Sequence, residues 1–204
     1  MATTTVKEKE TGVQFAASMG FKPDSAPLIC LGAGVRTKKI GMINIKAYAV
    51  ALYVHPEDAR PALAGFGAAA ARPAALAKDP TYYGALLALP RKSLHLIFVR
   101  DVPSKKVAEA LATLPGVAAD VVETFLALLM SGLGSEVKNA QTMSLVADGG
   151  AVLVVLVDGD VKGEIPDAAL TTAVFHLFLR ESDPVSPSAR TAFAAGLPAV
   201  LAVA

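Results

Sequence analysis

The stretch from Met42 to Val54 is the strongest strand signal in the chain and constrains the fold more than any other feature. Apolar residues occupy its odd positions, whereas the even positions carry polar residues such as Asn44 and Lys46. Alternation with a period of two is typical of a strand with one buried face. Beyond Tyr48 both parities are apolar, so we expect this end of the strand to be covered on both faces.

A second strand is expected directly before this one. The apolar run 28–31 continues through a Gly-Ala-Gly segment into residues 35–40, and Gly41 separates it from the next run. We expect residues 35–40 and 42–54 to form a hairpin that turns near Gly41.

The other expected elements come in blocks of helices and blocks of strands. Residues 56–89 are rich in alanine with internal prolines, which indicates several short helices rather than one. The remaining expectations are a strand over 93–102, helices over 104–114 (with Ser104 as N-cap) and 119–131, strands over 142–146, 152–157 and 161–165, a helix from Pro166-Asp167 to about Arg180, and a last helix opening at Ser186-Pro187. Blocks of this kind predict an α+β fold, with helices layered on one face of an antiparallel sheet.

Length and charge bound the possible classes of protein. A chain of 204 residues is expected to form a single domain, 1–204, in which the polar residues 1–12 are flexible or form an edge segment. The net charge of +1 gives no basic footprint for nucleic acid. Mean hydropathy is +0.50, yet the longest uncharged runs, about 191–204 and 124–135, fall short of the ~18 residues of a membrane span.

No motif for catalysis, a metal or a cofactor is found. Cys30 is the only cysteine and lies in an apolar run, where a buried core residue is favoured over a nucleophile. His55, His95 and His176 are scattered and have no neighbours at metal-ligand spacing. The glycine pairs do not continue into a phosphate-binding loop. We therefore predict no catalytic residue, no metal and no cofactor.

Arg36 is the most informative single residue for function. It follows the Gly-Ala-Gly segment and enters a strand whose neighbours Val35 and Ile40 are apolar. One interpretation is a solvated residue at the edge of the sheet. The other is a guanidinium that points into an apolar cavity, where its planar fork would bind a carboxylate.

Tyr48 lies twelve residues further on, at the same strand parity as Arg36. If the hairpin turns near Gly41, an even-sum register places both side chains on one face and close together. A phenol beside a guanidinium supplies a second donor to the same oxyanion. A tyrosine that only fills the core is the alternative.

The same segment carries a resemblance to a known family. Residues Leu31 to Tyr53 resemble the block G-x-G-V-R … K-x-Y-A-x-G-L-Y of the chalcone-isomerase-fold proteins, and the runs 171–175, 184–187 and 196–201 resemble the end of the same proteins. The likeness extends from about residue 12 to the C-terminus. It implies an open-faced β-sandwich, in which a large antiparallel sheet lies under a layer of helices and the ligand is held between them.

Departures from the enzymes of this family separate its members. Chalcone isomerases close a flavanone ring and need positioned polar groups to do so. The family arginine falls on Arg36. Four of the enzymes' polar positions (a threonine, a tyrosine, an asparagine and a threonine) fall here on Tyr48, Pro103, Ala110 and Leu177. Arginine and tyrosine at the two strand positions are the pattern of the fatty-acid-binding members.

The resemblance therefore implies a monomer that is not an enzyme and binds a medium- or long-chain fatty acid. Arg36 and Tyr48 would hold the carboxylate, with Thr113 as a third polar contact. The alternatives are a chalcone isomerase (an intramolecular lyase) with a rearranged site, or a non-catalytic partner of flavonoid enzymes.

The compartment implied by the resemblance is the chloroplast stroma. The first ten residues have neither the apolar segment of a secretory signal nor the composition of a plastid transit peptide. A plastid location therefore rests on the resemblance alone, and the cytoplasm is the alternative.

Overall fold

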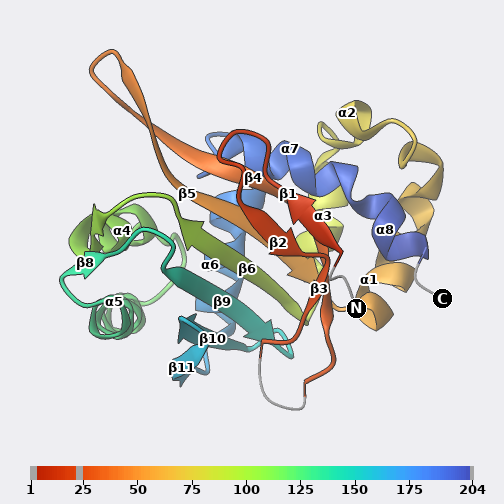
Figure 1. Ribbon diagram of the computed structural model, residues 1–204. Helices are drawn as coiled ribbons and strands as arrows, with labels where there is room; N and C mark the ends of the chain where they lie inside the picture. Colours follow the sequence, from red (N-terminus) through yellow and green to blue (C-terminus); the bar gives the residue numbers. More distant parts are fainter. Residues whose placement is uncertain (1–3, 22–24, 203–204) are drawn as a thin grey trace.

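A seven-stranded antiparallel sheet forms the centre of the computed structural model, which describes residues 4–21 and 25–202. In the order in which they lie side by side, its strands are β11 (Asp160–Ile165), β10 (Val152–Val157), β9 (Thr142–Asp148), β6 (Lys92–Phe98), β5 (Ile43–Val54), β4 (Leu28–Ile40) and β3 (Ser18–Met19). Figure 1 shows the sheet curling around the layer of helices behind it. The predicted α+β class and the large antiparallel sheet are confirmed.

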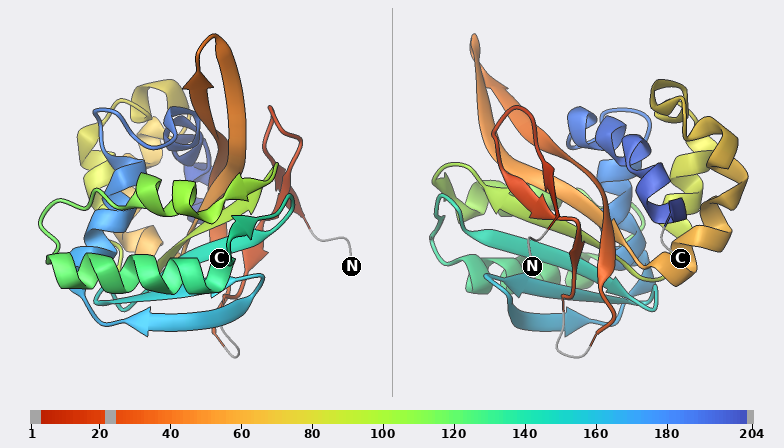
Figure 2. Two further views of the ribbon diagram at one scale, coloured as in Figure 1. Left: turned by 90° about the vertical axis from the view of Figure 1, so that its left-hand side faces the viewer. Right: turned by 45° about the vertical axis from the view of Figure 1, so that its right-hand side comes forward.

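The helices cover one face of this sheet (Figure 2). They are α1 (Pro56–Leu63), α2 (Pro73–Leu76), α3 (Pro80–Ala88), α4 (Ser104–Leu111), α5 (Ala119–Leu133), α6 (Ala168–Leu179), α7 (Pro187–Ala195) and α8 (Leu197–Ala202), with a 3-10 turn at Ala64–Ala69 between α1 and α2. Leu and Val side chains of β5, β6, β9 and β10 pack against apolar side chains of these helices in one large core. The expected layer of helices on one face of the sheet is therefore present.

The opposite face of the sheet is partly covered by the N-terminal segment. Strands β1 (Thr5–Lys7) and β2 (Gln14–Ala16) form an antiparallel hairpin, and Phe15 packs there with Phe21, Tyr53 and the edge of the His95 ring. Beyond Tyr48, strand β5 is thus buried on both sides, as its uninterrupted apolar pattern predicted. Residues 4–12, expected to be flexible or an edge segment, form part of this covering hairpin.

Three expected boundaries are wrong. Ser104 is the first residue of α4, and the N-cap position is occupied by Pro103. The Ser104 hydroxyl is buried and donates a long hydrogen bond of 3.5 Å to the carbonyl of Leu133. The helix also ends at Leu111 instead of residue 114. The strand expected over 93–102 stops at Phe98; after a short connection, β7 (Val102–Pro103) pairs with β8 (Glu136–Val137) outside the main sheet.

Glycines allow α7 to lie directly on β4. A Cβ atom added to Gly34 would come within 2.3 Å of the backbone nitrogen of Ala189, and one added to Gly32 within 2.3 Å of the carbonyl oxygen of Ala192. At the C-terminal end of α7, a Cβ atom added to Gly196 would lie 1.4 Å from the carbonyl oxygen of Leu31. The helix and the strand therefore meet backbone to backbone, which only residues without a Cβ permit.

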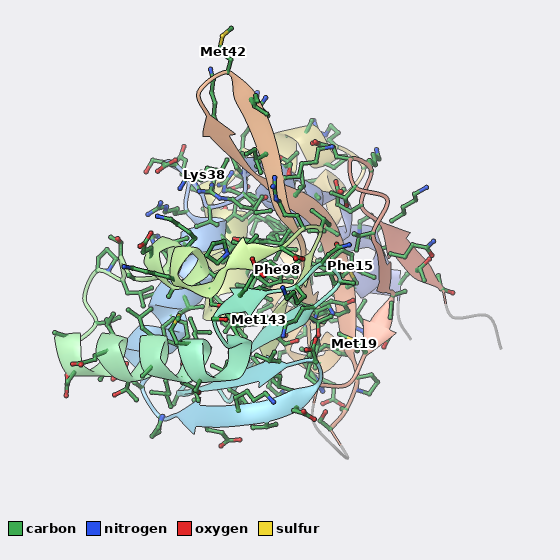
Figure 3. All side chains as sticks on the ribbon, turned by 60° about the vertical axis from the view of Figure 1, so that its left-hand side comes forward. Phe15, Met19, Lys38, Met42, Phe98 and Met143 are labelled. Atoms are coloured by element: carbon green, nitrogen blue, oxygen red, sulfur yellow. The ribbon has the colours of Figure 1, made fainter. Side chains whose placement is uncertain are left out.

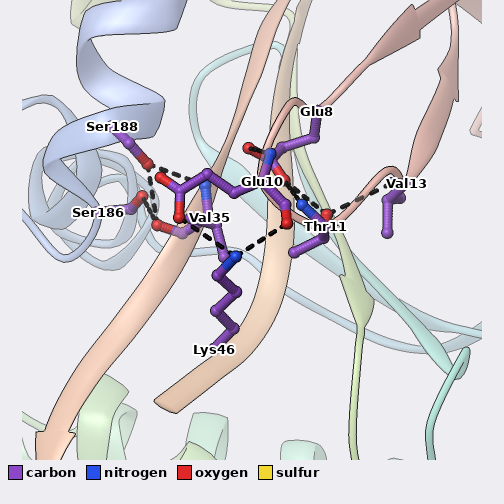
Figure 4. A network of polar contacts seen from close by, with 8 residues as sticks. All are labelled: Glu8, Glu10, Thr11, Val13, Val35, Lys46, Ser186 and Ser188. Carbon is purple, nitrogen blue, oxygen red and sulfur yellow. Dashed lines mark hydrogen bonds and ion pairs between the residues drawn. The ribbon is translucent and has the colours of Figure 1, made fainter. Parts of the chain in front are cut away.

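Two serines at the start of α7 fix this contact (Figure 4). The Val35 amide donates to the Ser188 hydroxyl at 2.9 Å, and the Ser186 hydroxyl donates to the Val35 carbonyl at 2.7 Å. Ser186 also accepts from the amide of Ala189 and so caps the helix. Both backbone groups of Val35 are thereby bonded to α7 immediately before Arg36.

We expect Gly34→Ala to lower the free energy of unfolding by at least about 3 kcal/mol, because the new methyl group overlaps the α7 backbone and cannot relax through a side chain. The matched control is Gly84→Ala, since Gly84 lies in α3 with nothing within 4 Å of its added Cβ. That change should be neutral or stabilise by ~0.5–1 kcal/mol. Urea denaturation of both variants tests this, and equal stabilities would contradict the proposed contact.

One lysine is buried inside the core. Lys92 on β6 is only 3% exposed; its ammonium donates to the carbonyl of Leu87 at 2.8 Å and to that of Leu89, and it lies 4.9 Å from the centre of the Phe175 ring. No carboxylate within the described residues pairs with it. Lys92 thus caps the C-terminal end of α3, while burial lowers the pKa of its ammonium from 10.5 to about 8.

This buried lysine predicts a rise in stability with pH. Above pH 8 the folded protein loses the Lys92 proton, whereas the unfolded chain keeps it up to about pH 10.5. Stability should therefore increase across that window, by about 2 kcal/mol at most between pH 7 and 9.5. Lys92→Met removes this contribution, so the test is the difference between wild type and variant in chemical denaturation at the two pH values. A difference that does not change with pH would show that Lys92 titrates normally.

Candidate functional site: a cavity beneath the β4–β5 hairpin

The candidate site depends on a bulge in the β4–β5 hairpin. From the turn at Gly41 as far as the pair Thr37 and Lys46 the two strands keep one register, but the next pair is Arg36 with Tyr48. Ala47 is therefore an extra residue on β5. Without this bulge Arg36 would face Ala47. With it, Arg36 and Tyr48 are direct cross-strand neighbours.

A cavity of about 390 Å³ lies where this pair faces α4. Its volume falls in the range of about 300–1,000 Å³ that is usual for small-molecule sites. Most of its wall is apolar, and its charged groups are four cations and one carboxylate, that of Asp101. The lining residues are Arg36, Lys38, Ile45, Ala47 and Tyr48 of the hairpin, Leu96 and Phe98 of β6, Arg100 to Pro103, and Lys106, Val107, Ala110 and Leu111, which lie on α4.

Arg36 is half-buried in the wall of this cavity. Its Nη1 donates to the carbonyl of Val185, just before the serines that fasten α7 to the strand. Within residues 4–21 and 25–202, no carboxylate forms an ion pair with it. Its guanidinium is therefore held by one backbone bond and keeps donors available for an anion.

Tyr48 is 6% exposed, and its ring meets the Phe98 ring edge to face with centroids 5.5 Å apart. The side chain lines the cavity, and its hydroxyl forms no hydrogen bond with another of the described residues. Burial raises the pKa of the Tyr48 phenol above its ordinary value, and the positive charge of Arg36 opposes that rise. The phenol thus stays neutral at physiological pH and can donate a hydrogen bond.

Of the other residues named in the sequence analysis, the structure places two at the cavity and two away from it. Pro103 and Ala110, which stand where the enzymes have polar groups, both line the cavity. Leu177 is buried within α6 and is not part of the lining. Thr113 lies beyond the end of α4, is exposed, and does not line the cavity either. The structure brings Arg36 and Tyr48 together but does not bring Thr113 to them.

Sequence reasoning missed three further cations of the lining: Lys38, Arg100 and Lys106. Lys38 and Lys106 are exposed, yet both also border the cavity. For Lys38 the signal was available, because it shares the strand parity of Arg36. For Lys106 and Arg100 it was not, since their positions depend on how α4 packs over the sheet.

Cys30 and His95 do not line the cavity. Cys30 is buried, and burial raises the pKa of its thiol to about 11, so the nucleophilic thiolate is disfavoured. His95 accepts or donates a 2.8 Å hydrogen bond with Ser144, and burial lowers its pKa to about 4. Among the described residues no three metal-ligating side chains come together, and none of the helices is long and apolar enough to cross a membrane.

Comparison with known proteins shows which solved structure this architecture is similar to. The sequence matches no family model and no curated protein. Among solved structures, the crystal structure of the fatty-acid binding protein AtFAP1 of Arabidopsis thaliana is similar, with a TM-score of 0.76 over 97% of this chain and 99% of that one. The protein has the chalcone-isomerase-type fold. At 23% identity, this likeness establishes the chalcone-isomerase-type fold and leaves the ligand open.

Proposed function

We propose that the protein binds a fatty acid in the cavity beneath the β4–β5 hairpin, with the carboxylate on Arg36 and Tyr48. The observation that carries this proposal is the pair of donors at the wall of an apolar cavity: within the described part of the chain, the Arg36 guanidinium has no carboxylate partner and the neighbouring Tyr48 phenol no hydrogen bond to another side chain or carbonyl. The similar Arabidopsis protein, itself a fatty-acid binding protein, supports the same class of ligand.

An amphipathic anion matches both parts of this site. Each methylene buried from water contributes ~0.8 kcal/mol, so ten of them contribute roughly 8 kcal/mol before the costs of association. A carboxylate costs several kcal/mol to desolvate without a partner, and a guanidinium with a neutral phenol offsets that cost. A medium- or long-chain fatty acid bound by a monomer is therefore the proposed complex. A role in plastid fatty-acid metabolism is part of the proposal and is supported only by the sequence resemblance.

The proposal includes the absence of chalcone isomerase activity. Cyclisation of a chalcone needs polar groups around the reacting atoms, and Pro103 and Ala110 leave this cavity apolar at two positions where the enzymes have them. Incubation with a 2′-hydroxychalcone, followed by its absorbance, should give no rate above the spontaneous one. Stereoselective cyclisation would overturn the non-enzymatic part of the proposal.

Arg36→Ala should weaken laurate binding about 100-fold, because the carboxylate loses a charge-assisted partner in an apolar site. Arg36→Lys should recover only part of that loss, since an ammonium has no bidentate fork. The control is Arg72→Ala, at an exposed arginine that lies outside the cavity. Calorimetric titration gives the affinities and urea denaturation the stabilities. Laurate affinity that stays at the wild-type level in Arg36→Ala would place the carboxylate elsewhere.

Tyr48→Phe should weaken laurate binding by ~1.5–3 kcal/mol, the range for one hydrogen bond to a charged acceptor. The ring remains in place against Phe98, so stability should change little. Tyr82→Phe is the matched control, because the Tyr82 hydroxyl donates to the Phe193 carbonyl at 2.9 Å, away from the cavity. It should lower stability and leave affinity unchanged. If Tyr48→Phe left laurate affinity unchanged while Tyr82→Phe lowered it, Tyr48 would not be part of the site.

A further inference from the structure

The tip of the β4–β5 hairpin is the most apolar exposed point of the described surface. Met42 is 98% exposed and Ile43 is 67% exposed, and both stand at the turn between the two strands. Figure 1 shows this hairpin projecting well beyond the body of the protein, and Figure 3 shows Met42 at its far end with Lys38 nearer the body. Two large apolar side chains that are exposed to water at a projecting tip indicate a site of contact with another molecule or a membrane.

An apolar track leads from this tip to the cavity. Ile43, Ile45 and Ala47 alternate along β5, which places them on one face of the strand. Ile45 and Ala47 line the cavity, whereas Ile43 is exposed beside Met42. The tip and the cavity are thus the two ends of one strip of apolar side chains.

The charge of the hairpin is uniformly positive. Residues 35–48 contain one arginine and three lysines and no acidic residue, although the whole chain has a net charge of only +1. Among the described residues, Lys38 and Lys39 have no ion-pair partner, while Lys46 pairs with Glu10. Arg100 and Lys106 add positive charge at the cavity. Cations set back from an apolar tip match the headgroups of an anionic membrane surface.

We propose that the hairpin docks on an anionic lipid surface, with Met42 and Ile43 entering the interface and Lys39 bound to headgroups. The apolar strip of Ile43, Ile45 and Ala47 then guides an acyl chain between the bilayer and the cavity. This second step rests on the proposed function, whereas the docking step does not.

A membrane fits this tip better than another protein does. A stable protein interface buries about 800 Å² on each partner, with a flat or complementary patch at its centre. The end of a two-residue hairpin turn offers only a narrow point, which suits insertion between lipid headgroups. A second copy of the chain would also need an anionic surface to meet these lysines.

The test of docking is flotation with lipid vesicles in the absence of fatty acid. The wild type should bind vesicles of phosphatidylcholine with about one third phosphatidylglycerol and bind pure phosphatidylcholine vesicles at least tenfold more weakly. The double change Met42→Ser with Ile43→Ser should lower binding about tenfold, as should Lys39→Glu, whose effect should vanish at high salt. The controls are Val161→Ser, at another exposed apolar residue on β11, and Lys78→Glu, at an exposed lysine between α2 and α3.

Three outcomes would overturn the docking proposal. These are no binding of the wild type to anionic vesicles, equal losses in the control variants, or a wild-type dimer that the tip variant converts to a monomer in gel filtration. The last result would assign the tip to a second copy of the chain.

Laurate affinity of the tip variant, measured in solution without vesicles, should match that of the wild type, because Met42 and Ile43 lie outside the cavity. Loss of vesicle binding with retained laurate binding supports the docking role. Vesicle binding by a protein that binds no laurate would refute the fatty-acid function and leave the docking step standing.

Discussion

The backbone contact between β4 and α7 is the constraint on which the site depends. Gly32, Gly34 and Gly196 remove the side chains that would separate helix from strand, and Ser186 and Ser188 then bond to both sides of the Val35 peptide. Because this peptide is fixed, the backbone position of the next residue, Arg36, is fixed as well. The carbonyl that receives its guanidinium belongs to the segment leading into the same helix.

A second constraint acts from the neighbouring strand. The extra residue Ala47 shifts the register of β5 by one, so that Tyr48 faces Arg36 across the hairpin. Packing of the Tyr48 ring on Phe98 then holds the phenol at the cavity wall. The guanidinium and the phenol are therefore positioned by different elements, α7 on one side and β6 on the other. Such rigid support would favour the proposed binding of a carboxylate, because little side-chain entropy would remain to be lost.

Three titratable groups that lie outside the cavity have structural surroundings of their own. Lys92 caps α3, His95 forms a hydrogen bond with Ser144, and Cys30 packs with Phe15 and Tyr53 on the face of the sheet that the N-terminal hairpin covers. Burial lowers the pKa of Lys92 and His95 and raises that of the Cys30 thiol, so each shift favours the neutral form. Both proposals for function depend instead on the positive charge at the cavity and along the hairpin.

The local pattern of the sequence determined the long strands of the main sheet, their block order and the hairpin turn at Gly41, because period-two alternation and turn residues act over a few neighbours. It also placed Arg36 and Tyr48 at matching parity. It did not reveal the short strands β1, β2, β3, β7 and β8. The bulge at Ala47 and the positions of Lys106, Arg100 and Thr113 were decided only in the folded molecule. Register and helix packing depend on contacts between distant segments, which no local pattern encodes. The sequence thus named the two residues that meet, and tertiary packing decided that a cavity lies between them and α4.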